Sequence, residues 1–123
     1  MKDYPKTVSR WVLSAGFLVA GTLHFVRPHV YARIVPPQLG HPLLLVYVSG
    51  CCEILGAIAL LVPRLRKAAG YGLLALLCAV YPANIYMALH PEVFRDIAAP
   101  AALWLRLPLQ FVLMAWVWWC CLV

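Results

Sequence analysis

The sequence predicts an all-α polytopic membrane protein: a single domain, residues 1–123, built as a four-transmembrane-helix bundle. Hydrophobic residues make up 65% of the chain and charged residues 11%. Soluble domains contain roughly 45–50% apolar and about 25% charged residues. The apolar residues form four runs, each near the roughly 20 residues that cross a hydrocarbon core. No run shows the period-two alternation of a barrel strand, so helices are the remaining way to satisfy the backbone in lipid.

The four helices are expected at about residues 9–26, 42–62, 68–90 and 101–123. The first run has the basic start of a signal peptide, but no small-residue cleavage site follows, and we interpret it as a retained helix. Prolines between the first two runs exclude one continuous helix there and leave room for a short turn at 29–35. The short connection between the second and third runs predicts antiparallel neighbours.

The distribution of Lys and Arg predicts that both termini are cytoplasmic. With the N-terminus inside, six of the ten basic residues lie on the cytoplasmic side: Lys2, Lys6, Arg10, Arg64, Arg66 and Lys67. The outer side then holds Arg27, Arg33, Arg95 and Arg106, a bias in the direction of the positive-inside rule. The basic residues flank apolar runs instead of sharing one face, which excludes a nucleic-acid partner. The expected location is the bacterial inner (cytoplasmic) membrane.

Five polar residues lie inside these runs, where a charge at the helix centre costs roughly 2.5–3.5 kcal/mol. They are His24, Glu53, Asn84, Arg106 and Gln110, at least one on each expected helix. We expect them to form one cluster in the outer half of the membrane, surrounded by Ser49, Tyr81 and Tyr86.

The positions of these residues along their helices are the basis of that expectation. Glu53 lies eleven residues beyond Pro42, about 16 Å down its helix. Asn84 follows Pro82, which frees a backbone carbonyl one turn earlier. Arg106 and Gln110 are four residues apart and therefore share a helix face.

The residues alone leave three interpretations of the cluster open. Glu53 and Arg106 could form a buried ion pair that fixes helix register, with the other members completing its hydrogen bonds. The cluster could instead bind a lipophilic molecule with a polar head, such as a quinone or a lipid. In that case Arg106, Asn84 and His24 would hold its oxygen atoms, and Glu53 would pair with Arg106 or accept a proton. A proton or ion path is the third interpretation. The scattered histidines predict no metal site, and no catalytic residue is identified.

Several segments together resemble the DoxX-like family of small four-helix integral membrane proteins. They are residues 49–56 (SGCCEILG), 60–64 (LLVPR), 81–88 (YPANIYMA), 35–37 (VPP) and 106–110 (RLPLQ), together with His24, Phe25 and Pro28. The resemblance covers nearly the whole chain. Members of that family include a subunit of a thiosulfate:quinone oxidoreductase and membrane partners of sulfur-handling and antioxidant enzymes. It assigns no catalytic role to the cluster residues.

The resemblance implies a membrane subunit or accessory protein of a quinone- or sulfur-linked redox process. The expected ligand of the intramembrane cluster is a quinone-like molecule or a lipid, so a quinone is the candidate cofactor. The alternative is a non-enzymatic membrane assembly or scaffold protein with a structural polar cluster. Its partners would be another protein or a second copy of the chain, and whether the chain is an enzyme stays open.

Overall fold

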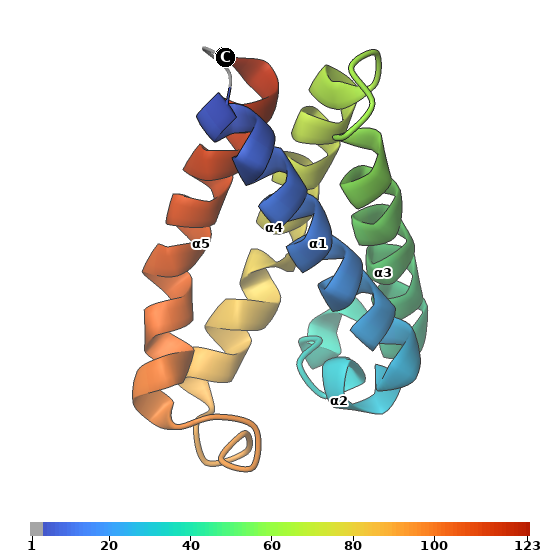
Figure 1. The fold of residues 1–123 in the computed structure, drawn as a ribbon. Helices are drawn as coiled ribbons and strands as arrows, with labels where there is room; N and C mark the ends of the chain where they lie inside the picture. Colours follow the sequence, from blue (N-terminus) through green and yellow to red (C-terminus); the bar gives the residue numbers. More distant parts are fainter. Residues whose placement is uncertain (1–3) are drawn as a thin grey trace.

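The computed structural model describes residues 4–123, which are helical with short connections. Four long helices form the bundle (Figure 1): α1 (Tyr4–Val26), α3 (Pro42–Ala59), α4 (Arg66–Leu89) and α5 (Pro100–Leu122). Between α1 and α3 lie the short helix α2 (Pro28–Ala32) and the 3₁₀ turn η1 (Pro37–Leu39). The all-α prediction is confirmed. The first helix begins at Tyr4, several residues before the expected start.

Prolines determine where three of the helices begin. Pro28, Pro42 and Pro100 lie in the first turns of α2, α3 and α5, where the N–H that proline lacks would have no helical partner. The chain turns into α3 through Gly40 and His41, whose φ angles are 67° and 44°. Glycine adopts this left-handed region freely, whereas a histidine there is uncommon.

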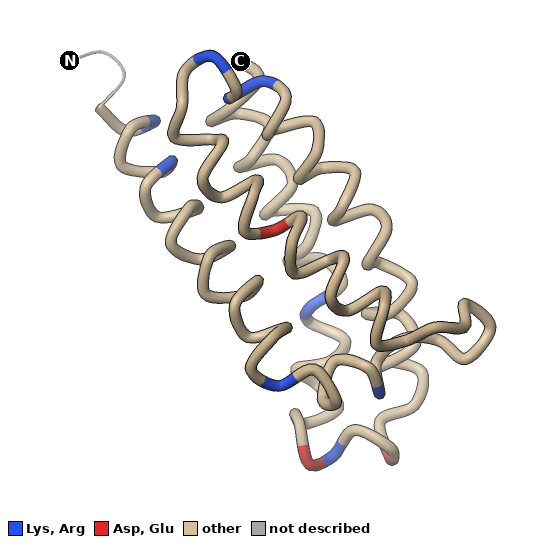
Figure 2. Tube along the Cα trace, turned by 90° about the vertical axis from the view of Figure 1, so that its right-hand side faces the viewer, with Lys and Arg blue, Asp and Glu red and all other residues tan. Residues whose placement is uncertain are grey.

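The bundle consists of two antiparallel helix pairs, α1 with α3 and α4 with α5 (Figures 1 and 2). In the first pair the backbones meet at Gly21 and Gly50. A Cβ atom on Gly50 would lie 2.8 Å from His24 Cβ and 3.0 Å from the Gly21 carbonyl oxygen. Close backbone approach at small residues is typical of membrane helix contacts, and here it brings His24 beside α3.

The two ends of the bundle are packed differently. The terminal end contains Tyr4, the C-terminus and the 60–65 turn, and the loop end contains α2, η1 and residues 90–99 (Figure 1). A core at the terminal end joins all four long helices: Leu13, Phe17, Ala57, Leu60, Ala69, Leu73, Leu77, Val117, Cys120 and Cys121. A smaller core at the loop end contains Met87, Phe94 and Leu103. The two helix pairs therefore share a hydrophobic core at the terminal end.

Polar contacts from α1 strengthen the terminal end. Ser14 Oγ donates a 2.7 Å hydrogen bond to the Ala57 carbonyl, and Arg10 Nε donates a 2.9 Å bond to the Cys120 carbonyl. Lys6 Nζ lies 3.1 Å from the Val123 oxygen. The last carbonyls of a helix lack helical partners, and cations stabilise that end of the helix dipole. α1 thus caps the C-terminus of α5.

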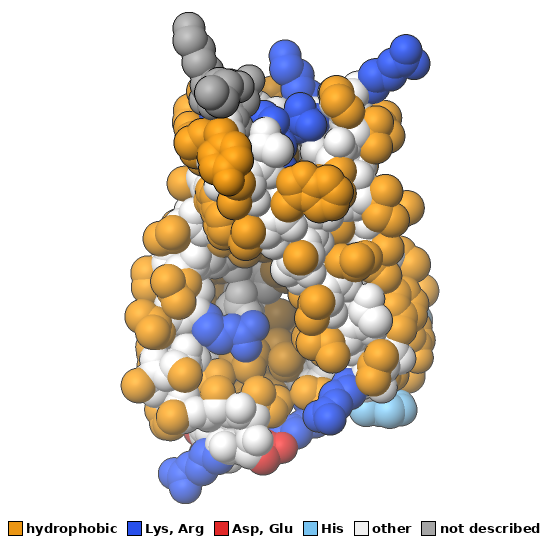
Figure 3. All heavy atoms as spheres, in the orientation of Figure 1, with side chains coloured by type: hydrophobic (Ala, Val, Ile, Leu, Met, Phe, Trp, Pro, Cys, Tyr) orange, Lys and Arg blue, Asp and Glu red, His pale blue; other side chains and the backbone are white. Residues whose placement is uncertain are grey.

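Three of the four long helices, α3, α4 and α5, are long and apolar enough to cross a membrane. Large apolar side chains cover the outside of the bundle, among them Leu55, Tyr71 and Val112 (Figure 3). α1 has 23 residues but is not among these three, because Arg10 and His24 lower its apolarity. The three apolar helices indicate a membrane protein.

Candidate functional site

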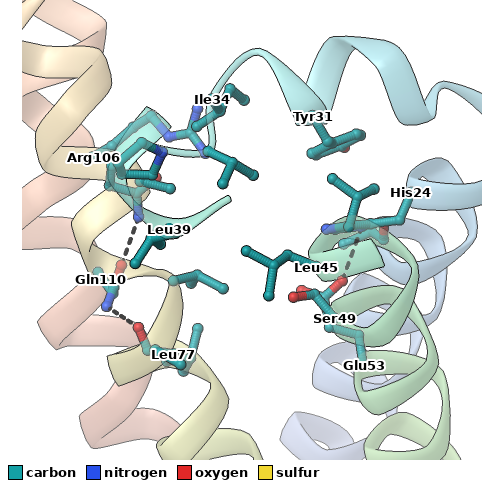
Figure 4. A pocket seen from close by; sticks show the side chains of 18 of the residues that line it. His24, Tyr31, Ile34, Leu39, Leu45, Ser49, Glu53, Leu77, Arg106 and Gln110 are labelled. Carbon is teal, nitrogen blue, oxygen red and sulfur yellow. Dashed lines mark hydrogen bonds and ion pairs between the residues drawn. The ribbon is translucent and has the colours of Figure 1, made fainter. Parts of the chain in front are cut away.

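A cavity of about 470 Å³ lies between the α1/α3 pair and the α4/α5 pair. Its lining includes all five residues of the expected cluster, together with Ser49: His24, Glu53, Asn84, Arg106 and Gln110. Figure 4 shows that the polar side chains occupy two facing walls, one from α1 and α3 and one from α4 and α5. Leucines, among them Leu45, Leu77, Leu109 and Leu113, supply the apolar lining. The volume and the mixture of many apolar with a few polar groups are typical of small-molecule pockets.

On the α1/α3 wall, the Glu53 carboxylate has an oxygen without a donor. Glu53 Oε2 lies 3.3 Å from His24 Nδ1, but the Ala20 carbonyl oxygen is closer to that nitrogen, at 2.7 Å. Because Nδ1 carries at most one proton, it donates to Ala20. Within residues 4–123, Glu53 Oε2 is then buried without a hydrogen-bond partner. Leaving a buried acceptor without a hydrogen bond costs about 1–3 kcal/mol of folding free energy, or more for a charged group. The Glu53 oxygen on this wall can therefore accept a hydrogen bond from a ligand.

Tyr31 of α2 covers this wall and was not anticipated from the sequence. Its ring stacks on His24 with the ring centroids 4.2 Å apart and the planes 16° from parallel, and it lines the cavity. Burial raises the pKa of the Tyr31 phenol; the charge of Glu53 raises it further and that of Arg106 lowers it. The phenol of Tyr31 is therefore close enough to both Glu53 and Arg106 for their charges to affect it. Tyr31 follows Pro28, where helical periodicity is interrupted, and the sequence carries no other signal for it.

On the opposite wall, Gln110 joins α4 to α5. Its Nε2 donates to the Leu77 carbonyl at 2.6 Å, and its Oε1 accepts from Asn84 Nδ2 at 2.6 Å. The side chain is 6% exposed. The carbonyl that Pro82 was expected to free belongs to Cys78, so the amide reaches the carbonyl next to it. These two hydrogen bonds hold Gln110 and Asn84 together on the α4/α5 wall.

Arg106 lies on the same wall and faces the cavity (Figure 4). The Glu53–Arg106 ion pair considered from the sequence is not formed: Glu53 lies near the His24 imidazole instead, and within residues 4–123 the carboxylate that pairs with a guanidinium is Asp96, with Arg33. The Glu53 and Arg106 side chains lie on opposite walls of the cavity (Figure 4). The polar contact of Arg106 Nη1 is with the Met87 sulfur at 3.7 Å, a weak acceptor. A guanidinium with donors to spare therefore faces the cavity.

The two tyrosines expected around the cluster lie elsewhere. Tyr81 packs edge-on against Phe111, with ring centroids 5.3 Å apart. Tyr86 packs against His90 and Phe94 at the loop end. Neither lines the cavity, whereas Ser49 does and points into it from α3 (Figure 4).

An ion pair at the loop end ties the two helix pairs together. Arg33 Nη1 and Nη2 donate to the two Asp96 carboxylate oxygens at 2.8 and 3.1 Å, and Nη2 also donates to the Val93 carbonyl at 2.9 Å. Arg33 follows α2, in the connection from α1 to α3, whereas Asp96 lies in the connection from α4 to α5. The bidentate pair therefore spans the gap between the helix pairs at the end away from the main core.

Acid is expected to release this ion pair. The Arg33 guanidinium hydrogen-bonds the Asp96 carboxylate and holds its pKa below the ordinary value. A depressed pKa means that the pair stabilises the fold above the unfolded-state pKa of about 3.9 and stops doing so as the pH falls through the folded-state value. A carboxyl NMR titration should give Asp96 a midpoint below that of ordinary aspartate. In Arg33→Ala the midpoint should rise, and an unchanged midpoint would contradict the contact.

The side of the bundle between α1 and α5 is where the cavity meets the surroundings. These helices are in contact at the terminal end through Arg10 and Lys6 and diverge toward the loop end (Figure 1). Figure 3 shows the surface hollowed between them. Ala20 of α1 and Leu109 of α5 are among the lining residues. The opening therefore lies on the apolar flank of the bundle.

The described part of the chain offers no metal centre. No three His, Cys, Asp or Glu side chains lie close enough together in residues 4–123 to hold an ion. The five cysteines are all free thiols; Cys120 and Cys121 are buried in the terminal core. The chemistry of the cavity therefore depends on one carboxylate, one guanidinium, two amides, an imidazole, a hydroxyl and a phenol.

Comparison with known proteins identifies a family and no described relative. No curated protein and no solved structure matches the chain. One family model matches residues 13–121, which include every residue that lines the cavity. The chain therefore belongs to the family described as "Domain of unknown function (DUF8561)".

Proposed function

We propose that the protein spans the membrane four times, with both termini in the cytoplasm of a bacterial cell and the bundle in the inner membrane. α1 supports this because it packs against α3 and exposes Trp11, Val12 and Val19 outward. Most basic residues lie at the two ends of the bundle (Figure 2). The terminal end has five of them, Lys6, Arg10, Arg64, Arg66 and Lys67, which fits a cytoplasmic side. Lys2, also expected there, lies outside the described residues.

The function that the cavity supports best is binding of a lipophilic molecule with a polar head, either quinone-like or a lipid. The observation that carries this proposal is the pair of facing walls: an acceptor on Glu53 without a donor and a guanidinium on Arg106 with a sulfur as its partner. A cluster that was only structural would be expected to satisfy these groups internally, because unsatisfied polar groups are costly at membrane depth. From the resemblance to the DoxX-like family we propose that such binding serves a membrane subunit or accessory of a quinone- or sulfur-linked redox process.

A second candidate function is a membrane assembly scaffold. Part of the cluster does serve the fold, because Gln110 bridges Asn84 and the Leu77 carbonyl between α4 and α5. The exposed apolar flanks of α3 and α5 would then contact a protein partner or a second copy. This alternative predicts a co-purifying protein and an empty cavity.

Native mass spectrometry of the detergent-purified protein separates the two functions. We expect the wild type to retain one small amphiphile and Arg106→Ala to lose it, with retention reduced about tenfold or more for the loss of a charged hydrogen bond. Leu105→Ala is the control, since this neighbour is exposed on the same helix and does not line the cavity. A wild type without ligand, with a protein partner bound, would favour the scaffold.

Glu53→Gln tests whether the carboxylate serves the ligand or the fold. The substitution keeps the shape of the side chain and removes its charge, so we expect expression close to that of the wild type and weaker retention of the amphiphile. Ligand retention and the yield of folded protein are measured on the same preparations. Loss of folded protein in Glu53→Gln, with no change in ligand per folded molecule, would assign the carboxylate to the fold.

A further inference from the structure

The cavity presents opposite charges on facing walls, without a contact between them. Arg106 points into the space from α5, and Glu53 points into it from α3 (Figure 4). Each lacks a strong partner among the described residues: Arg106 Nη1 contacts a thioether sulfur. Glu53 Oε2 lies 3.3 Å from His24 Nδ1 but accepts no hydrogen bond from it. A ligand that satisfies both walls must carry a negative acceptor at one side and an N–H or O–H donor at the other.

The opening of the cavity restricts the source of that ligand. The terminal end is closed by the core that joins the four long helices, and at the loop end α2 and η1 contribute Tyr31 and Leu39 to the lining. The flank between α1 and α5 is hollowed (Figure 3), with Ala20, Leu109 and Leu113 among the cavity lining on these helices. A molecule with acyl chains can enter there while its chains stay in the bilayer, whereas a water-soluble molecule would have to cross the apolar flank.

We propose that the cavity binds the phosphoethanolamine headgroup of an aminophospholipid, entering from the bilayer between α1 and α5. The phosphate accepts hydrogen bonds from Arg106, whose planar fork suits phosphate oxygens. The ammonium group donates to the Glu53 carboxylate, supplying the hydrogen bond that His24 gives to Ala20 instead. Ser49 and Asn84 lie on the same two walls. This inference rests on the proposed ligand-binding function and names the class of ligand.

The same charges discriminate between headgroups. Phosphatidylcholine has a phosphate and a positive charge, but its trimethylammonium group has no N–H to donate to Glu53. Phosphatidylglycerol brings hydroxyl donors and a net negative charge that Glu53 disfavours. A long-chain quinone offers two acceptors, which suit Arg106 and leave the Glu53 oxygen without a donor. Phosphatidylethanolamine is the headgroup that satisfies both walls.

The test is a competition in nanodiscs that contain equal parts of phosphatidylethanolamine, phosphatidylcholine and phosphatidylglycerol, with a long-chain quinone added. After transfer to detergent, native mass spectrometry of the wild type should show phosphatidylethanolamine retained about tenfold or more over each other lipid and over the quinone, the gain expected for one charged hydrogen bond. Glu53→Gln should abolish the preference over phosphatidylcholine, and Arg106→Ala should lower retention of all phospholipids. The matched controls are Glu92→Gln and Arg95→Ala, which change the same charges outside the cavity.

Two further experiments test whether the lipid enters between α1 and α5 and whether the headgroup comes from the bilayer or from water. Ala20→Trp places a large ring on the lining of α1 and should reduce retention, whereas Val19→Trp, on an exposed position next to it, should not. Water-soluble glycerophosphoethanolamine at millimolar concentration should fail to displace the lipid. Displacement by it, or equal effects of the two tryptophan variants, would overturn entry from the bilayer.

The outcomes also separate this inference from the proposed function. Retention of the quinone, or of all three phospholipids equally, would overturn the headgroup assignment while the cavity would still be a binding site. Retention of nothing by a folded wild type would overturn both. If Glu53→Gln fails to fold, the selectivity of the wild type among the lipids decides the inference without any variant.

Discussion

Replacing Gly50 with alanine should strongly destabilise the α1/α3 pair. The new Cβ would lie 2.8 Å from His24 Cβ and 3.0 Å from the Gly21 carbonyl oxygen, and neither atom belongs to the flexible end of a side chain. Gly21→Ala should act alike, since its Cβ would meet the Gly50 carbonyl oxygen at 2.9 Å. We expect each to cost about 1–3 kcal/mol, the usual range for overpacking, measured as a lower thermal midpoint in detergent.

Two other glycines of the same bundle are the controls for this prediction. A Cβ on Gly16 of α1 or on Gly72 of α4 would meet nothing within 4 Å. Alanine there should raise stability by roughly 0.5–1 kcal/mol, because glycine is a poor helix former. Equal loss of stability in Gly16→Ala and Gly50→Ala would mean that the α1/α3 crossing is not where the structure places it.

Gln110→Leu should also have a large effect, for a different reason. Gln110 is 6% exposed, and its removal leaves the Leu77 carbonyl and the Asn84 amide without their partner. Each buried unsatisfied group costs about 1–3 kcal/mol. We expect a lower thermal midpoint and looser packing of α4 against α5, seen as lower expression and greater protease sensitivity.

A double substitution tests whether the loss comes from the unsatisfied amide. In Asn84→Leu combined with Gln110→Leu, both partners of the side-chain bond are gone, so the double variant should be more stable than the sum of the two single effects predicts. Strict additivity would mean that the 2.6 Å bond contributes no coupling.

Five of the polar residues that line the cavity could be expected from the sequence, whereas the contacts between them could not. A polar residue inside an apolar run must face protein or a cavity, so five such residues on four helices could be expected to converge. Which wall each occupies depends on how far every helix is rotated about its own axis. Because of that rotation, Glu53 lies near His24 and Arg106 does not contact Glu53. The spacing of residues along one helix does not predict how that helix is rotated relative to its neighbours.

The contacts of the glycines and of the connections between helices could not be predicted from the sequence either. Gly16 and Ala20 have the spacing of a helix contact, yet the close approach occurs at Gly21 and Gly50, because the crossing point is a property of two helices together. Tyr31 reaches the cavity only because the chain reverses between α1 and α3 and lays its ring on His24. Such contacts between a connection and a helix depend on tertiary structure alone.

The caps that α1 provides for α5 set an order for the assembly of the protein. Arg10 and Lys6 bond to Cys120 and Val123, residues at the two extremes of the 123-residue chain. During synthesis α1 and α3 can pair as soon as the second of them has entered the bilayer. The bonds to the last turn of α5 must wait until that helix has also been made and has entered the bilayer. Until then, the basic residues of the first helix lack these carbonyls, so the contact between α1 and α5 forms after the α1/α3 pair.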